Sequence, residues 1–395
     1  MQCSMSKKHK QILVKTVSDC DNHIMSNVSK LFRHRKVYDL NGTDDLFARS
    51  MRDNALFQQK NCEDYRRILA LNGFDPADIK TVDDLTDLPF IPTVYFKHHY
   101  LSSVPDKKMF IKATSSGTSG TMSMIGFDMK SLLTGVPMVL NVGRYHKLWS
   151  ARPVNYIIFG YQPTKENKTA FSKTAYGFTF FAPALSRTFA LTVTDKGYKL
   201  DWDNVLKAME RCAKSRFPMR TIGFPAYTYF LLRDMKAKGI RYKMPKGSMI
   251  TMGGGWKSFY TEQPDKKEFY SLVEEVLGIP EDHVIEFFGA VEHPILYTDC
   301  RCHHFHVPCY SRVIIRDPDT LKPLKNGIPG LLNLISPMVR SVPIISIMTD
   351  DLAILHDEGC DCGETSPWLE IIGRVGITDI VTCAAGGEKY LKEGS

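Results

Sequence analysis

The chain has 395 residues, with 51 Lys and Arg against 43 Asp and Glu, and a formal net charge of +8. Its 43% hydrophobic and 24% charged residues are typical of a globular protein, and the length allows two or three subdomains. No apolar run approaches the roughly 18 residues that span a bilayer. The basic cluster at 7–10 lacks a following apolar stretch, so it is not a secretory signal. Basic residues form no stripe interleaved with aromatics, which argues against nucleic-acid binding. We expect a cytoplasmic protein without a membrane span.

The spacing of apolar residues changes twice along the chain. The first 80 residues read as helical, whereas strands and helices alternate from about residue 110 to residue 282, which predicts an α/β fold. Short strands and tight turns then predict a small β-rich subdomain. We therefore predict four parts: a helical region at 1–85, an α/β core at 86–282, a β-rich subdomain at 283–372, and a short tail at 373–395.

A stretch rich in hydroxyls and glycine follows the apolar run 109–111. Glycines let the backbone approach a ligand closely, and exposed N–H groups with hydroxyls suit an anion such as phosphate. No Lys follows the second glycine, so this is not a Walker loop. A flexible linker is the alternative reading. The candidate phosphate-binding residues are Thr114, Ser115, Ser116, Gly117, Thr118, Ser119 and Gly120.

Four later loops contain polar or glycine residues where predicted strands end. Each of them alone is an ordinary turn or cap, but their order is informative. With the loop at 114–120, they resemble the phosphate loop, adenine loop, aromatic-Gly-x-x-Glu motif, Thr-x-Asp motif and Gly-Arg hinge of the adenylate-forming superfamily. These loops are 253–255, 288–292, 349–351 and 373–374.

Within that superfamily the sequence resembles the LuxE-type acyl-protein synthetases most, and then the phenylacetate–CoA ligase branch. The likeness extends over residues 45–383 and is carried by 88–97, 114–120, 288–293 and 304–308. It implies a large domain of mixed and parallel sheets with helices, in which 86–282 binds ATP and the acyl group. It also implies a small β-rich subdomain. The superfamily's mobile C-terminal domain is expected to be largely absent, because only 21 residues follow Arg374.

The resemblance also implies residue roles. Residues of the loop at 114–120 would hold the ATP phosphates, and Glu292 would help hold Mg²⁺. Asp351 would bind the ribose, with Asp350 as its competitor, and Arg374 would contact ribose or phosphate. Gly253, Gly254 and Gly255 would pass along the adenine, and Phe288 and Gly289 of the aromatic-Gly-x-x-Glu motif are further expected cofactor-binding residues.

Two further features depart from most of the superfamily. Trp256 stands where a small residue is usual, so we expect a differently built adenine pocket. Cys383, followed by Ala-Ala-Gly-Gly, matches the Cys near the end of acyl-protein synthetases, and its thiolate would accept the acyl group. The alternative is an inert cysteine in a final strand.

Six of the ten cysteines follow residue 299, and four of them form two Cys-x-Cys pairs, the first of which is followed directly by histidines. Two thiolates from one turn with a Cys and a His from another suit a structural tetrahedral Zn²⁺. The predicted ligands are Cys300, His306, Cys360 and Cys362. Cys302 or His304 could replace either of the first two, because alternate residues of a strand share a face.

Together these features predict an ATP-dependent enzyme that activates a carboxylic acid, by resemblance a long-chain fatty acid, as an acyl-adenylate. The acyl group would pass to a protein thiol, and the acceptor would be an acyl-CoA-reductase-type protein. Two alternatives stay open. One is an aryl- or acyl-CoA ligase of the phenylacetate branch, and the other is a non-catalytic, zinc-containing nucleotide-binding protein.

Overall fold

A computed structural model of the chain describes residues 26–114, 123–164, 170–195, 197–256, 259 and 262–374. Its largest sheet has seven strands in the order β10-β9-β8-β7-β4-β5-β6. The five strands from β9 to β5 run parallel, and β10 and β6 close the two edges antiparallel. The strands are β4 (Val154–Tyr161), β5 (Ala184–Thr194), β6 (Gly197–Leu200), β7 (Met219–Gly223), β8 (Ile250–Gly253), β9 (Val284–Ala290) and β10 (His293–Thr298).

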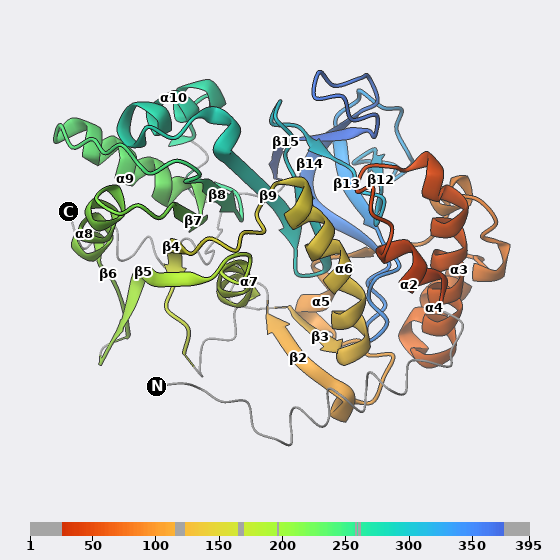
Figure 1. Cartoon of the computed structure of the whole chain (residues 1–395). Helices are drawn as coiled ribbons and strands as arrows, with labels where there is room; N and C mark the ends of the chain where they lie inside the picture. Colours follow the sequence, from red (N-terminus) through yellow and green to blue (C-terminus); the bar gives the residue numbers. More distant parts are fainter. Residues whose placement is uncertain are drawn as a thin grey trace.

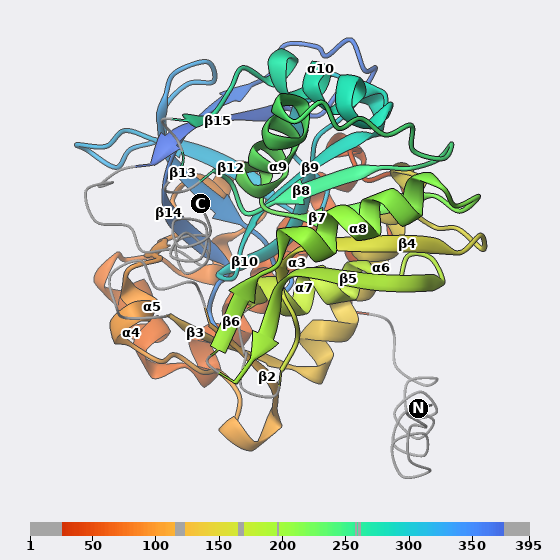
Figure 2. The same cartoon turned by 90° about the vertical axis from the view of Figure 1, so that its left-hand side faces the viewer.

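Helices cover both faces of this sheet, as buried parallel strands require. Ile157 and Phe159 of β4 pack toward the side of α8, α9 and α10, whereas Tyr156 and Ile158 pack toward the side of α7. Figure 2 shows α8, α9 and α10 lying over one face of the strands. The helices are α7 (Ala170–Phe178), α8 (Trp202–Ala213), α9 (Pro225–Ala237) and α10 (Lys266–Leu277). This arrangement confirms the predicted α/β class.

A second sheet of six strands has the order β11-β15-β14-β13-β12, and β1 pairs in parallel with β14. The remaining pairs in this sheet are antiparallel. The strands are β1 (Ile91–Pro92), β11 (Phe305–His306), β12 (Arg312–Arg316), β13 (Gly330–Ile335), β14 (Ser346–His356) and β15 (Trp368–Arg374).

The N-terminal helices share one hydrophobic core with the six-stranded sheet, and both lie on the same side of the molecule (Figure 1). On α3, the buried Asn54 side chain donates 2.8 Å hydrogen bonds to the carbonyls of Pro337 and Val339, because buried loop carbonyls need a donor. The helices are α2 (Asn27–Phe32), α3 (Asp44–Asn61), α4 (Glu63–Leu71) and α5 (Tyr95–His98). The four-part domain division stays a prediction, and strands on both sides of residue 282 belong to the seven-stranded sheet.

A two-stranded hairpin and a long helix lie between the two sheets in sequence. The hairpin pairs β2 (Met109–Thr114) with β3 (Met124–Asp128), and α6 (Met129–Tyr145) follows directly. Asp128 caps α6 by accepting a 2.8 Å hydrogen bond from the Ser131 amide. Among the described residues, no helix is both long and apolar enough to cross a membrane.

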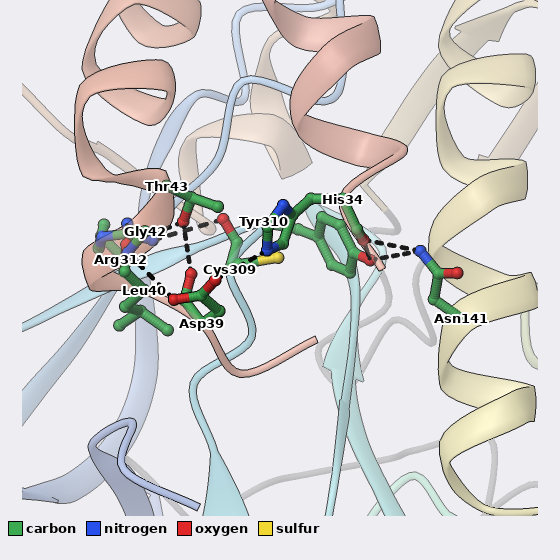
Figure 3. A network of polar contacts seen from close by, with 9 residues as sticks. All are labelled: His34, Asp39, Leu40, Gly42, Thr43, Asn141, Cys309, Tyr310 and Arg312. Atoms are coloured by element: carbon green, nitrogen blue, oxygen red, sulfur yellow. Dashed lines mark hydrogen bonds and ion pairs between the residues drawn. The ribbon is translucent and has the colours of Figure 1, made fainter. Parts of the chain in front are cut away.

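A polar network fixes α6 to the N-terminal segment (Figure 3). The Asn141 amide and the Tyr310 hydroxyl both donate 2.8 Å hydrogen bonds to the carbonyl of His34. Nearby, the buried Arg312 guanidinium contacts the carboxylate of Asp44 at 2.6 Å. The buried face of α6 is therefore held by directed hydrogen bonds as well as by packing.

Candidate functional site

The predicted phosphate loop connects the two strands of the hairpin. Thr114 pairs with Met124 at the end of the β2–β3 ladder, so the loop begins and ends at this point. Thr114 itself is partly buried. The other predicted residues of the loop, Ser115, Ser116, Gly117, Thr118, Ser119 and Gly120, lie outside the described residues.

Glu292 lies beside the end of this loop. Its carboxylate is 6% exposed and accepts a 2.5 Å hydrogen bond from the hydroxyl of Ser123, the first described residue after the loop. Burial raises the pKa of Glu292, and the Ser123 hydroxyl and the charge of Arg374 oppose that rise. A buried carboxylate beside a hydroxyl-rich loop is suited to a hard cation bound to phosphate.

The ends of β14 and β15 bring an arginine and two carboxylates to the same place. Asp351 and Arg374 are direct partners in the ladder. The Arg374 guanidinium lies 3.5 Å from the Asp350 carboxylate and 3.8 Å from that of Asp351. The charges of Arg374 and Asp350 both act on Glu292. Three of the loops predicted from the sequence therefore meet in one charged cluster.

The glycine triplet begins at the carboxyl end of β8, and Phe288 and Gly289, which the sequence predicts at a turn, lie within the last residues of the neighbouring parallel strand β9. Gly253 of β8 stands opposite Phe287 of β9. A side chain at 253 would approach the Phe287 carbonyl to 3.2 Å, and Gly254 and Gly255 have left-handed φ angles of 89° and 68°. Such positions favour glycine. Ligands of open α/β sheets gather at this edge.

Trp256 points away from this edge into the core. It is 7% exposed, and its ring packs edge-to-face against Tyr229 at 5.6 Å and Phe269 at 6.4 Å. The tryptophan therefore anchors the glycine loop on α9 and α10. A tryptophan stands after the glycines because its ring packs this end of the loop against Tyr229 and Phe269.

Sequence reasoning missed Ser123, which lies just beyond the run of hydroxyls and glycines. It also missed a small charged crevice next to the glycine loop. Glu286 and Lys266 line this crevice together with Trp256 and Tyr270. The Lys266 amine lies 3.9 Å from the Glu286 carboxylate, whose pKa is raised by burial. The signal was available, because Glu286 stands two residues before Phe288 and so shares its face of β9.

The cysteine and histidine groups meet next to the six-stranded sheet. The ligand atoms of Cys300, His306, Cys360 and Cys362 all lie within 4.8 Å of one another. The Cys300 and Cys360 sulfurs are 3.7 Å apart, and the Cys362 sulfur is 3.3 Å from His306 Nε2. Zinc–ligand bonds of about 2.0–2.3 Å give tetrahedral edges of about 3.5–3.8 Å, so these separations suit a tetrahedral ion.

Backbone amides point at the sulfurs of the cluster, and one imidazole tautomer of His306 is fixed. Backbone amides donate to the sulfurs of Cys300, Cys360 and Cys362 at 3.3 to 3.5 Å. His306 Nδ1 lies 2.8 Å from the Ser366 carbonyl, so it carries the proton and Nε2 faces the sulfurs. The ring of His304, an alternative ligand, stacks on Trp368 at 3.7 Å with its Nδ1 3.4 Å from the Cys360 sulfur.

Cys383 and Cys309 are the two cysteines after residue 299 that lie outside the Cys-x-Cys pairs. Cys383, the predicted acyl carrier, lies outside the described residues. Cys309 is fully buried, and burial raises the pKa of its thiol to about 12, so it is a packing residue.

The α/β fold, with the glycines at the ends of β8 and β9 and the charged cluster of Glu292, Asp350 and Arg374, has the features expected of an adenylate-forming acid–thiol ligase. Residues 14–391 match the family model for acyl-protein synthetase, LuxE, and the chain belongs to that family.

Relatives and solved structures agree with this assignment. The chain is 28% identical over 332 residues, 83% of each chain, to the long-chain-fatty-acid–luciferin-component ligase of Vibrio harveyi. The protein of the same name from Aliivibrio fischeri is 26% identical over 339 residues, 85% of each chain. A crystal structure of 2-hydroxyisobutyryl-CoA ligase superposes with a TM-score of 0.64 at 16% identity, covering 87% of this chain and 77% of that one. The last likeness concerns the fold alone.

Proposed function

We propose that this chain activates a long-chain fatty acid with ATP and passes the acyl group to a thiol of an acceptor protein. The observation that carries this proposal is the cluster of Glu292, Ser123, Arg374 and Asp350 at the base of the hydroxyl-rich loop, in a chain of the acyl-protein synthetase family. The names of the two bacterial relatives support the fatty acid and the protein acceptor.

In the first half-reaction a carboxylate oxygen of the acid attacks the α-phosphorus of ATP. The bond from that phosphorus to the oxygen bridging toward the β-phosphate breaks, and pyrophosphate leaves. Both reactants are anionic, so the work of the protein is alignment and charge stabilisation. Residues 114–120 would hold the phosphates and Glu292 would hold Mg²⁺, which offsets phosphate charge when bound. Arg374 would face the nucleotide with Asp350 and Asp351 beside it, and Asp351 would accept hydrogen bonds from the ribose.

In the second half-reaction a thiolate attacks the acyl carbonyl and the bond to AMP breaks, leaving a thioester. Cys383 is our proposed first acceptor, from which the acyl group passes to an acyl-CoA-reductase-type protein. Cys383→Ser should abolish hydroxylamine-sensitive labelling of the enzyme by radioactive fatty acid, while Cys309→Ser keeps it. Undiminished labelling of Cys383→Ser would remove this cysteine from the pathway.

The Cys/His cluster would hold one structural Zn²⁺, since four protein donors complete a tetrahedral shell with no position left for water. Such an ion would join the β10–β11 connection, which holds Cys300, to the β14–β15 turn, which holds Cys360 and Cys362. The first segment follows β10, which begins next to Glu292, and the second leads into β15, which ends at Arg374. The proposed role is therefore to fix those strands.

A CoA ligase is the second candidate. The chain is 23% identical over 324 residues to a phenylacetate–coenzyme A ligase of Thermus thermophilus. The two proposals separate when CoA is added to the acyl-adenylate. Consumption of CoA at the rate of acid activation favours the CoA ligase, and acyl transfer only to protein thiols favours the acyl-protein synthetase.

A further inference from the structure

One segment of the chain, which runs from α6 to the end of β5, is depleted of acidic residues. From residue 129 to residue 194 the sequence has eight Lys and Arg and a single acidic residue, Glu166. This segment carries almost the whole net charge of +8. It includes α6 and α7, which lie next to each other in Figure 1.

The outward face of α6 is apolar. Leu133, Val136 and Leu140 are 51%, 46% and 40% exposed, and with Met129 they follow the spacing of one helix face. The opposite face holds Asn141 and its hydrogen bonds to the N-terminal segment, as Figure 3 shows. Those hydrogen bonds fix the rotation of α6 about its own axis, and the apolar stripe therefore faces outward.

The stripe ends in a cleft with a positively charged rim. The cleft has a volume of about 430 Å³ and is lined by Leu140, Gly143, Arg144, Lys147 and Trp149. The Trp149 indole is held by a 3.0 Å hydrogen bond to the Leu140 carbonyl and by edge-to-face packing on Phe181. The cleft therefore has a fixed aromatic wall, an apolar floor and two cations.

Lys147 stands where glycine is the ordinary residue. Its φ is 54°, in the left-handed region, at the position that ends α6. The Leu148 amide donates to the Gly143 carbonyl at 2.7 Å and the Lys147 amide to that of Arg144 at 3.1 Å, which is the Schellman pattern. A lysine at this position leaves the backbone in a strained conformation that a glycine would adopt without strain. The amine at the rim of the cleft therefore comes with a loss of folding stability.

We infer that the α6 surface, Met129, Leu133, Val136 and Leu140 with the Arg144–Lys147 cleft, docks the acyl-acceptor protein through an apolar segment flanked by Asp or Glu. This inference rests on the proposed function, which requires a protein to receive the acyl group. Charge complementarity favours an acidic partner, because the residues that line the cleft include Arg144 and Lys147 and no Asp or Glu. The fixed walls of the cleft suit a side chain of a protein, which inserts into a concave site.

The test measures binding of the purified acyl-CoA-reductase-type protein of the same organism to the full chain by calorimetry, at 50 and 200 mM salt. Arg144→Glu/Lys147→Glu should weaken binding at least 30-fold and flatten its salt dependence. Lys147→Gly should weaken binding several-fold while raising the melting temperature by about 2 °C, since it relieves the left-handed strain. The latter variant separates loss of contact from loss of fold.

The matched control is Lys207→Glu/Lys246→Glu, which reverses two exposed charges elsewhere on the chain and should bind within twofold of the wild type. Fatty-acid-dependent ATP–pyrophosphate exchange should stay within twofold in every variant. Unchanged binding by the charge-reversed variant overturns the docking site, as does a wild type that does not bind the acceptor. If the charge-reversed variant loses self-association while acceptor binding stays intact, the surface belongs to an interface with a second copy. If it loses binding to phosphatidylglycerol vesicles while acceptor binding stays intact, the surface belongs to a membrane contact. Either result also overturns the docking site. Absence of exchange in the wild type would instead refute the proposed function, and the binding data would still decide the surface.

Discussion

The hydroxyl of Ser123 donates a 2.5 Å hydrogen bond to the buried carboxylate of Glu292, across 169 positions of sequence. The bond joins the end of the hydroxyl-rich loop to the turn after β9. Because Glu292 also lies in the field of Arg374 and Asp350, a change in the charge at this carboxylate affects every part of the candidate site.

Glu292→Gln should lower fatty-acid-dependent pyrophosphate exchange at least about 100-fold, because the amide cannot bind Mg²⁺ as the carboxylate does. The same variant should be more stable than the wild type in the absence of nucleotide and Mg²⁺. Burial raises the pKa of Glu292 in the folded chain, so the ionised carboxylate destabilises the fold. This destabilisation is fully present above the folded pKa, and it vanishes as the pH falls below the unfolded pKa.

Thermal unfolding of the wild type and of Glu292→Gln from pH 5 to pH 8 checks the predicted direction of the stability change. The melting temperature of Glu292→Gln should exceed that of the wild type by about 2 °C at pH 8, and the difference should shrink toward pH 5. Glu281→Gln, at a 58% exposed carboxylate, is the control and should change neither property. A variant that is less stable at pH 8 would contradict the account of this carboxylate.

Removal of zinc should destabilise the chain. Protein purified without chelator should contain one zinc per chain, and Cys360→Ser should lose it and melt about 5 °C lower or more. Cys302→Ser should keep the zinc, because Cys302 lies outside the set of four whose ligand atoms converge. Zinc that is lost from Cys302→Ser and retained in Cys360→Ser would mean that the ligand set is wrong.

Trp256 should matter for stability and little for nucleotide affinity. Trp256→Ala removes a buried ring that packs on Tyr229 and Phe269 and should cost about 3–5 kcal/mol of unfolding free energy. Trp256→Phe should cost less and leave the KM for ATP within about twofold. A tenfold rise in that KM for Trp256→Phe would place the indole against the nucleotide instead.

Two buried histidines should make the fold sensitive to acid. Burial lowers the pKa of His146 to about 4 and that of His293 to about 3, so both are neutral in the folded chain near pH 7. Below the ordinary pKa of about 6.5 the unfolded chain binds more protons, so stability falls as pH falls toward 4. Between pH 6 and 4.5, His146→Gln should reduce the slope of unfolding free energy against pH by about 1 kcal/mol per unit. An unchanged slope would mean that His146 takes up protons while folded.

The parts of the site that the sequence made predictable are those written in contiguous motifs. Two Cys-x-Cys pairs and a His on alternate positions of short extended segments pointed to one cluster, because alternate residues share a face. The edge of the seven-stranded sheet could likewise be predicted, since glycines ended successive strands. The α/β class followed from the alternation of strands and helices.

The remaining features depend on long-range packing that no local pattern records. Ser123 carries no motif of its own and becomes part of the site only through Glu292. Trp256 could not be assigned to core or ligand without the positions of Tyr229 and Phe269. The packing of α3 against the connection between β13 and β14, through Asn54 and the carbonyls of Pro337 and Val339, joins segments about 280 residues apart.

The measurement that tests the central claim most directly is acid-dependent exchange of labelled pyrophosphate into ATP, with Mg²⁺, over a panel of fatty, aryl and amino acids. We predict exchange that is strongest with long-chain fatty acids, needs no CoA or acceptor protein, and is lost in Glu292→Gln. Absence of exchange with every acid, from protein that is folded, would contradict the proposal that this chain activates carboxylic acids.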